Sequence, residues 1–214
     1  MSSLLFDIGA NVGAYTQARK HEFERCVLVE ANPLLCEKLQ ATFQAEIEQS
    51  HVIVCNNIVS KEASATFYVN KADTISTADI EWVQQSRFSE SYRQWTPINN
   101  VATISIDELI RVYGVPSYLK IDVEGYEWNV IQSLTQCLQN THIAFEWAEE
   151  KKAELLLILD WLHNLGYTQF SVQYEDAYNF QPIEWLEYQV VYQQLEQELM
   201  IQRKSKWGMI HVRK

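Results

Sequence analysis

The chain has 214 residues, of which 47% are hydrophobic and 21% charged, as in globular proteins long enough to bury a sizeable core as one domain. Its formal net charge of −11 repels phosphate backbones, which disfavours a nucleic-acid substrate. No apolar run approaches the roughly 20 residues needed to span a bilayer, so we expect no membrane insertion and a cytoplasmic protein whose four cysteines are reduced core residues.

The first predicted element is a strand that runs into a turn and then a helix. Residues 4–16, LLFDIGANVGAYT, place an apolar run before the pattern D-x-G-x-N-x-G, formed by Asp7, Gly9, Asn11 and Gly13. Glycine at such a turn permits a positive φ or a close approach of the backbone to a ligand. The pattern differs from the G-x-G-x-x-G of dinucleotide sites and suits a ligand without a pyrophosphate, such as S-adenosylmethionine. A plain structural turn is the alternative.

A second predicted strand, residues 25–30, follows a helix over residues 13–25 and ends in Glu30. An acidic residue about 20 positions beyond the glycines is where nucleotide-binding α/β folds hold a pair of ribose hydroxyls. Asn32 is a predicted N-cap with Pro33 at the first helical position of a helix that continues through Ile47. After a third strand at residues 51–55, Asn57 is either a contact for the adenine edge or an ordinary turn residue.

The most irregular segment, residues 70–100, lies between strands predicted at residues 65–69 and 101–105. It is long, polar and rich in aromatic side chains, which is typical of a lid or an acceptor-binding loop. A helical insert that packs its tryptophans on the core is the alternative. Arg87 and Arg93 stand out in an acidic chain, and we expect them to be available for a carboxylate or a sugar phosphate on the acceptor.

The second half begins with a capping box of Ser105 and Glu108 that opens a helix ending at residue 113. A fourth strand, residues 118–122, ends in Asp122. Lys120 shares the side of this strand with Asp122, where it either fixes the charge of the carboxylate or is a solvated strand residue. The remaining predicted elements are a helix at 127–138, a strand at 142–147 with Glu146 near its end, a helix at 153–165, a strand at 168–174, a long helix at 182–204 and a strand at 207–212.

Three stretches, FDIGANVGAYT, VEANP and LKIDVEGYE, together resemble the FkbM family of S-adenosylmethionine-dependent methyltransferases. The resemblance extends over about residues 4–165 and weakens beyond residue 166. It implies an α/β, Rossmann-like class I methyltransferase fold with a seven-stranded, mostly parallel sheet of order 3-2-1-4-5-7-6 and helices on both faces. It also implies one domain over residues 1–214. Because the first strand begins near residue 4, we expect the helices that commonly precede this motif to be missing and the cleft to be open, or covered by a partner, on that side.

The strand ends bring the candidate site residues to one rim of the sheet, since ligands of open α/β sheets lie beyond the carboxyl ends of the strands. We expect Asp7 and the backbone from Gly9 to Gly13 to hold the methionine part of the cofactor, and Glu30 to hold the ribose. The wider set of expected cofactor contacts is Asp7, Gly9, Asn11, Gly13, Glu30, Asn32, Asn57 and Asp122.

Methyl transfer mainly requires alignment of the acceptor and removal of its proton. The candidate carboxylates for this role are Asp122, Glu124, Glu127 and Glu146. Such a cluster raises its own pKa values or binds a hard cation, so Mg²⁺ held by Asp122 and Glu146 is an alternative.

Two functions follow from these residues. The first is an O-methyltransferase that acts on a hydroxyl of a small-molecule or carbohydrate-like acceptor. The second is a catalytically inactive cofactor-binding domain that serves as a partner or scaffold protein, because a fold does not fix a function. All of the motif carboxylates are present, which favours the enzyme, and a dinucleotide oxidoreductase ranks third because G-x-G-x-x-G is absent.

Overall fold

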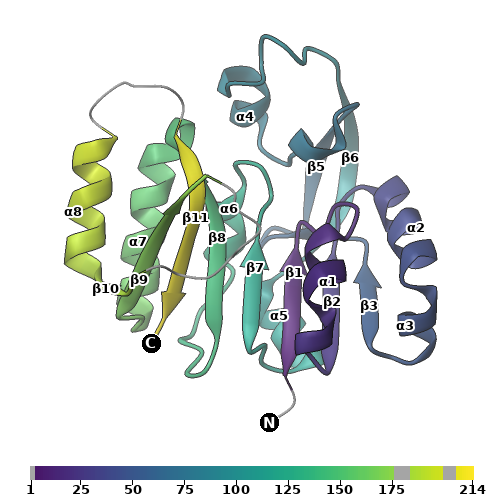
Figure 1. Cartoon of the computed structure of the whole chain (residues 1–214). Helices are drawn as coiled ribbons and strands as arrows, with labels where there is room; N and C mark the ends of the chain where they lie inside the picture. Colours follow the sequence, from purple (N-terminus) through teal and green to yellow (C-terminus); the bar gives the residue numbers. More distant parts are fainter. Residues whose placement is uncertain (1–2, 176–183, 200–205) are drawn as a thin grey trace.

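Eight strands form the main sheet of the protein (Figure 1). The computed structural model describes residues 3–175, 184–199 and 206–214. The strands of this sheet are β1 (Leu4–Ile8), β2 (Arg25–Val29), β3 (Val52–Cys55), β7 (Tyr118–Ile121), β8 (His142–Ala148), β9 (Gln169–Tyr174), β10 (Leu186–Glu187) and β11 (Trp207–Arg213). They follow the order β10-β9-β11-β8-β7-β1-β2-β3, and β1, β2, β3, β7 and β8 run parallel to one another. The predicted α/β class with a mostly parallel sheet is confirmed.

The sheet has one strand more than predicted. Seven of its strands follow the predicted order, with β11 antiparallel between β8 and β9. The eighth strand, β10, pairs antiparallel with β9 at the edge of the sheet, within the stretch where a long helix was predicted. That prediction was wrong at its start, because Leu186 and Glu187 continue the sheet before the helix begins.

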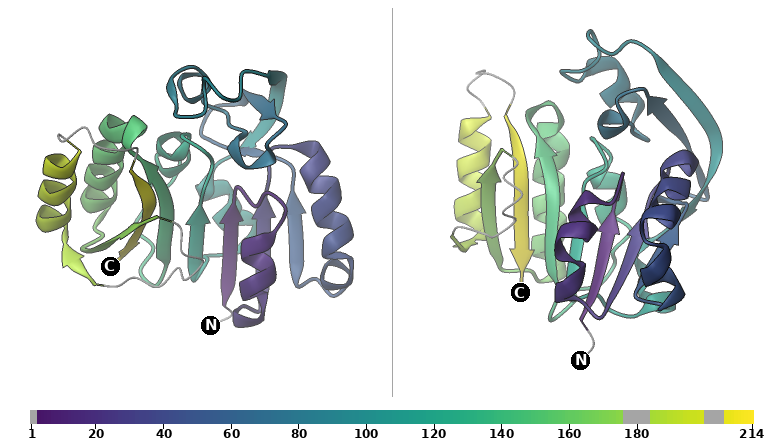
Figure 2. Two further views of the ribbon diagram at one scale, coloured as in Figure 1. Left: turned by 45° about the horizontal axis from the view of Figure 1, so that its top comes forward. Right: turned by 45° about the vertical axis from the view of Figure 1, so that its right-hand side comes forward.

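Helices cover both faces of the sheet (Figures 1 and 2). Their bounds are α1 (Ala14–Arg19), α2 (Pro33–Thr42), α3 (Gln44–Glu48), α4 (Ile80–Gln85), α5 (Ile106–Tyr113), α6 (Glu127–Ile131), α7 (Lys152–Leu165) and α8 (Tyr188–Glu198). Short 3₁₀ helices occur at Lys20–Glu22, Asp73–Ile75 and Glu149–Lys151. In the described ranges, no helix has both the length and the apolar character needed to cross a bilayer.

The alternation of side chains along β1 explains why two separate cores form. Leu4, Phe6 and Ile8 join the larger core beneath α5, α6, α7 and α8, whereas Leu5 joins a smaller core beneath α1 and α2. Successive residues of a strand point to opposite faces, so a run that is apolar at successive positions, as Leu4, Leu5 and Phe6 are, contributes to both cores. Asp7 lies on the same face as Leu5, and this face contains Tyr15 of α1.

Several helices are shorter than predicted. The first ends at Arg19 and gives way to a 3₁₀ turn, and the second breaks at Phe43 before α3 begins. The helix predicted at residues 127–138 ends at Ile131, because the Ser133 hydroxyl donates to the Val130 carbonyl and accepts from the Ile106 N–H. The long helix predicted at 182–204 is observed over Tyr188–Glu198, and residues 182–183 and 200–204 of that prediction lie outside the described residues.

A second, three-stranded sheet stands over the carboxyl ends of the parallel strands (Figures 1 and 2). Its strands are β4 (Ile58–Val59), β5 (Ser64–Asn70) and β6 (Trp95–Ile104), in the order β4-β6-β5. β6 starts at Trp95, so the last part of the segment predicted as irregular, residues 95–100, is a strand. What remains between β5 and β6 contains α4 and arches over the same edge of the main sheet.

Candidate active site

A cavity of about 620 Å³ lies between the carboxyl edge of the main sheet and the small sheet. Its lining comes from the loop after β1, the ends of β2 and β8, the turn after β7, strands β4 and β5, and the segment between β5 and β6. The strand order reverses direction at β1 and β7, which is where ligands bind in open α/β sheets. The volume lies within the roughly 300 to 1,000 Å³ of small-molecule sites.

The two glycines of the loop after β1 have different surroundings. Gly9 (φ 76°) lines the cavity, and a Cβ there would lie 1.8 Å from the Asp122 carbonyl oxygen, so no other residue fits without moving the backbone. Gly13 (φ 81°) does not line the cavity, and a Cβ there would lie 2.5 Å from the Phe43 ring. The expected cofactor role of Gly13 is therefore not supported by its position, which instead lets α1 begin against α2.

Glu30, directly after β2, is positioned by backbone N–H groups. Its Oε2 accepts a hydrogen bond from the Asn11 N–H and its Oε1 from the Asn32 N–H, both at 2.8 Å. Burial raises the pKa of Glu30, and these two donors oppose the shift. Glu30 and Asn11 both line the cavity, which agrees with the positions expected of them.

Asn32 and Asn57, both expected at the cofactor, differ in position. The Asn32 side chain accepts from the Leu34 N–H at 3.1 Å and caps α2, and Asn32 is buried away from the cavity. Asn57 lines the cavity, and its side-chain amide donates to the Ala102 carbonyl at 3.4 Å. Only Asn57 is therefore placed to face a ligand.

Asp7 lies beneath the loop instead of beside the cavity. It is fully buried, it is absent from the cavity lining, and its Oδ2 accepts from the Thr16 hydroxyl at 2.7 Å. Its Oδ1 lies 3.3 Å from Nζ of Lys120, a cavity residue whose ammonium is only 5% exposed. The expectation that Asp7 contacts the cofactor directly is corrected here, because a carboxylate in the small core faces α1. The solvated interpretation of Lys120 is also wrong.

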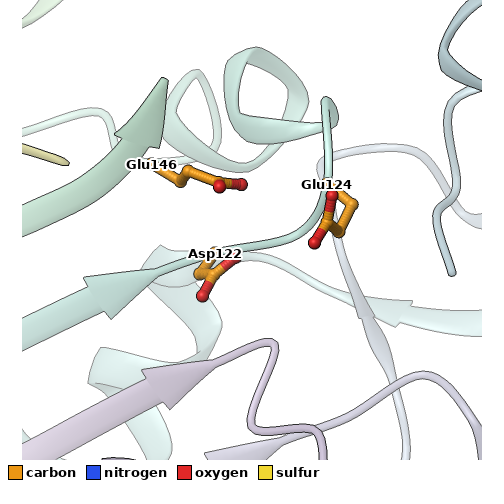
Figure 3. Close-up of side chains that lie close together, drawn as sticks. All are labelled: Asp122, Glu124 and Glu146. Carbon is orange, nitrogen blue, oxygen red and sulfur yellow. The ribbon is translucent and has the colours of Figure 1, made fainter. Parts of the chain in front are cut away.

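Three carboxylates converge at the far side of the cavity (Figure 3). Asp122 and Glu124 come from the turn after β7 and Glu146 from β8, and one oxygen of each lies within 4.8 Å of the others. Burial, followed by repulsion from the neighbouring carboxylates, raises the pKa of Glu124 and of Glu146 well above the ordinary value. The cluster therefore keeps a proton at a pH where isolated carboxyl groups have lost theirs.

Glu127, the fourth candidate carboxylate, does not line the cavity. Its Oε1 accepts from the Val123 N–H at 3.0 Å, so the side chain braces the turn that carries Asp122 and Glu124. Burial raises the pKa of Glu127 to about 7, although the Val123 N–H acts in the opposite direction. The predicted catalytic role is replaced by a supporting one, since the carboxylate is directed at the backbone.

The segment between β5 and β6 supplies an aromatic roof. Trp82, Phe88 and Tyr92 line the cavity, and their rings form two successive edge-to-face contacts. Trp82 is 3% exposed and packs on Gly125 of the carboxylate turn, where a Cβ would lie 2.8 Å from the indole ring. The lid interpretation and the packed-insert interpretation thus both describe part of this segment.

Ion pairs fasten this roof to the body of the protein. Arg87 donates to both oxygens of Glu150 at 2.7 and 2.6 Å, and Lys151 lies 2.6 Å from Asp79 at the N-cap of α4. Arg87 lines the cavity, but its guanidinium already has a carboxylate partner within the chain. Arg93 donates to the Glu90 carbonyl and does not line the cavity. Arg87 is therefore already paired and Arg93 lies outside the cavity lining, so neither arginine offers an unpaired charge to an acceptor in the cavity.

Comparisons with known proteins agree with this architecture. A model of the methyltransferase FkbM domain matches residues 7–168. Among solved structures, the chain is similar to the methyltransferase FkbM from Methylobacillus flagellatus KT, with 14% identity and a TM-score of 0.54, over 99% of this chain and 43% of that one. The chain thus spans less than half the length of that protein. A search of curated proteins finds no match.

Two further structures have lower scores. The precorrin-6y C5,15-methyltransferase from Geobacter metallireducens GS-15 has 10% identity and a TM-score of 0.47, over 100% of this chain and 82% of that one. The magnesium protoporphyrin IX methyltransferase from Synechocystis PCC 6803 with bound SAM has 9% identity and a TM-score of 0.45, over 100% and 71%. At these identities, the structural comparisons show the fold alone.

The raised pKa of Glu127 predicts a pH-dependent stability. Between pH 4.5 and about 7 the unfolded chain releases this proton and the folded chain keeps it, so the free energy of unfolding falls as the pH rises. Glu127→Gln keeps an oxygen for the Val123 N–H but has no proton to release. Over this pH window, its free energy of unfolding should therefore fall by on the order of 3 kcal/mol less than that of the wild type. Urea unfolding at several pH values measures the difference, with Glu37→Gln on the exposed side of α2 as control. Equal losses in Glu127→Gln and wild type would contradict the assignment.

Proposed function

We propose, on the premise that the chain belongs to the FkbM methyltransferase family, that it transfers a methyl group from S-adenosylmethionine to a hydroxyl of a small-molecule or carbohydrate-like acceptor. The observation that carries the proposal is that Glu30 and the cluster of Asp122, Glu124 and Glu146 line a single cavity at the strand-order reversal. Glu30 stands where a ribose is held in such folds, and the cluster stands where the acceptor would meet the cofactor.

The residues of the cavity fit this cofactor. Glu30 is fixed by backbone donors and has lone pairs left for the two ribose hydroxyls. Asn57 offers an amide to the base, while the backbone at Gly9 and Asn11 borders the methionine part. The carboxylates give the cavity a negative potential that favours the positive charge of a sulfonium.

The bound cofactor supplies a methyl group on a sulfonium, which leaves as a neutral thioether. The chain itself has to orient the acceptor oxygen in line with the bond that breaks and take up the proton released as the new C–O bond forms. We assign this proton to a carboxylate of the cluster, with Asp122 as the first candidate because its side chain is 38% exposed to the cavity side. Glu124 and Glu146 have raised pKa values and serve as alternative acceptors or as donors to the acceptor's other hydroxyls.

The lining also limits the chemistry of the acceptor. Lys120 and Arg87, the cationic side chains of the lining, are both ion-paired with carboxylates of the chain. An acceptor with a carboxylate or phosphate near the reacting hydroxyl would therefore meet net negative charge. A neutral, hydroxyl-rich molecule is favoured, since carboxylates bind its hydroxyls and the rings of Trp82 and Tyr92 offer flat apolar surfaces.

Two other uses of the site are separable by experiment. The cluster has oxygen ligands of the kind that Mg²⁺ prefers, so metal-assisted transfer is the alternative to a carboxylate base. A scaffold without catalysis would have no need of buried carboxylates at the cavity, since burying them is costly.

Calorimetric titration tests the cofactor. The protein should bind S-adenosylmethionine and S-adenosylhomocysteine but not NADH. Glu30→Ala should weaken binding about tenfold or more, because it removes charge-assisted hydrogen bonds to the ribose. Glu37→Ala, on the exposed side of α2, is the matched control and should bind as the wild type does. If NADH bound as tightly as S-adenosylmethionine, the assignment of the cofactor would be wrong.

The proposed role of the carboxylate cluster is tested with Asp122→Asn in a screen of hydroxylated sugars and lipids for release of S-adenosylhomocysteine. The variant should still bind the cofactor but transfer methyl about 10² to 10⁴ times more slowly, the range for loss of a general base. A chelator arm separates the alternatives, because activity lost to chelation and restored by Mg²⁺ identifies a metal site. Wild-type turnover in Asp122→Asn, with no chelator effect, would move the catalytic role to Glu146 or to the lid segment.

Hydrogen exchange tests the roof as a lid. Backbone amides of residues 72–92 should exchange more slowly once S-adenosylhomocysteine is bound, because the segment closes over the filled cavity. Arg87→Gln should speed exchange of this segment without ligand by removing its link to Glu150, whereas Arg93→Gln, on an exposed arginine, should not. Equally slow exchange in all four samples would favour a permanently packed insert.

A further inference from the structure

Lys120 occupies the centre of the strand-order reversal. It lies in β7, pairs in register with Asp7 of β1, and points to the side of the sheet that carries the glycine loop. The residue is 4% exposed and lines the cavity. A lysine so deeply buried is costly unless each of its N–H donors finds an acceptor.

The ammonium has one hydrogen bond and two ion pairs within the chain. Nζ lies 3.0 Å from the Gly9 carbonyl oxygen, 3.3 Å from Oδ1 of Asp7 and 3.2 Å from Oδ2 of Asp122. Burial alone would lower the pKa of Lys120, but the carboxylates of Asp122 and Asp7 raise it above the ordinary value, so the side chain stays charged. Of these contacts, Gly9 belongs to the glycine loop and Asp122 to the carboxylate cluster.

The two segments that Lys120 joins also touch each other. The absence of a Cβ at Gly9 brings its backbone against the Asp122 carbonyl, and the Asp122 N–H donates to the Ile8 carbonyl at 3.0 Å. A shift of either segment therefore displaces the other. A group that is anchored beneath both segments would fix the distance between them.

We propose that Lys120 is a positioning residue that sets the glycine loop and the Asp122 carboxylate relative to each other. This inference rests on the proposed function, because the loop would hold the cofactor and Asp122 would face the acceptor. Lys120 does not itself take the proton, since its ammonium is already protonated and ion-paired with Asp7 and Asp122. Its ion pair with Asp122 Oδ2 fixes the orientation of the carboxylate that would face the acceptor.

The alternative is a purely structural role, in which Lys120 only neutralises the buried Asp7. The double variant Lys120→Met/Asp7→Asn separates the two, because it removes both charges and keeps an oxygen that accepts from the Thr16 hydroxyl. Lys120→Met alone should lower the urea midpoint by leaving Asp7 unpaired, and the double variant should recover much of it. Lys206→Met is the control, since the Lys206 side chain forms its ion pair with Glu198 of α8, away from both segments.

Hydrogen exchange without any cofactor gives the decisive readout. In the double variant, amides of residues 9–13 and 122–125 should exchange about tenfold faster than in wild type, while those of α7 keep the wild-type rate. Affinity for S-adenosylhomocysteine, measured on the same samples, should fall about tenfold. Lys206→Met should change neither segment.

Wild-type exchange rates in both segments of the double variant would overturn the proposal, and Lys120 would then only neutralise Asp7. Faster exchange in one segment alone would also overturn it. If wild-type protein bound no S-adenosylhomocysteine, the proposed function would fail, but the exchange rates would still decide the role of Lys120.

Discussion

The burial of carboxylates at the carboxyl edge of the sheet is the constraint on which the site depends. A carboxylate withdrawn from water is unfavourable unless it is paired, hydrogen-bonded or protonated. All three solutions contribute here: backbone N–H donors hold Glu30, the Thr16 hydroxyl and the ion pair with Lys120 stabilise Asp7, and the raised pKa of Glu146 favours its protonated form. The groups are oriented before any ligand arrives, which is the arrangement that lets electrostatic interactions assist a reaction without reorganisation.

The roof of the cavity is coupled to the same carboxylates. Trp82 packs on Gly125, the residue directly after Glu124, and Glu124 itself adopts a positive φ of 54° that few residues with a side chain tolerate. Arg87 and Lys151 then attach the segment to the start of α7 by ion pairs, each largely screened from solvent. A change in the position of the roof is thus transmitted first to the turn that carries the reaction-end carboxylates.

The sequence predicted the main sheet well because its strands are short apolar runs that end in polar or glycine-rich turns. In the small sheet it predicted β5 and the last part of β6 but missed β4, which has two residues, and the start of β6, which begins among polar residues at Trp95, where no alternation marks a strand. Helix ends failed where side chains competed with the backbone, as Ser133 does after α6. Such contacts join residues far apart in the chain, so local periodicity contains no information about them.

The sequence predicted which residues lie near the site but not which of their side chains face the cavity. Position at a strand end brings Asp7, Glu30 and Asp122 to one edge of the sheet, but the direction of each side chain depends on which core lies beneath it. Asp7 and Lys120 point to the same face, and α1 covers Asp7 whereas the cavity reaches Lys120.

The glycine-rich motif shows the same division of roles. Gly9 is required because the backbone of one loop touches that of another, and Gly13 because a helix starts against the Phe43 ring. Neither requirement involves the chemistry of a ligand. Because the motif encodes the meeting of two loops beside a cavity, it identifies the place of the site, while the proposed reaction depends on Glu30 and on the carboxylates after β7 and on β8. A chain that kept the glycines and lost those carboxylates would retain the architecture of this edge without the groups to which we assign the reaction.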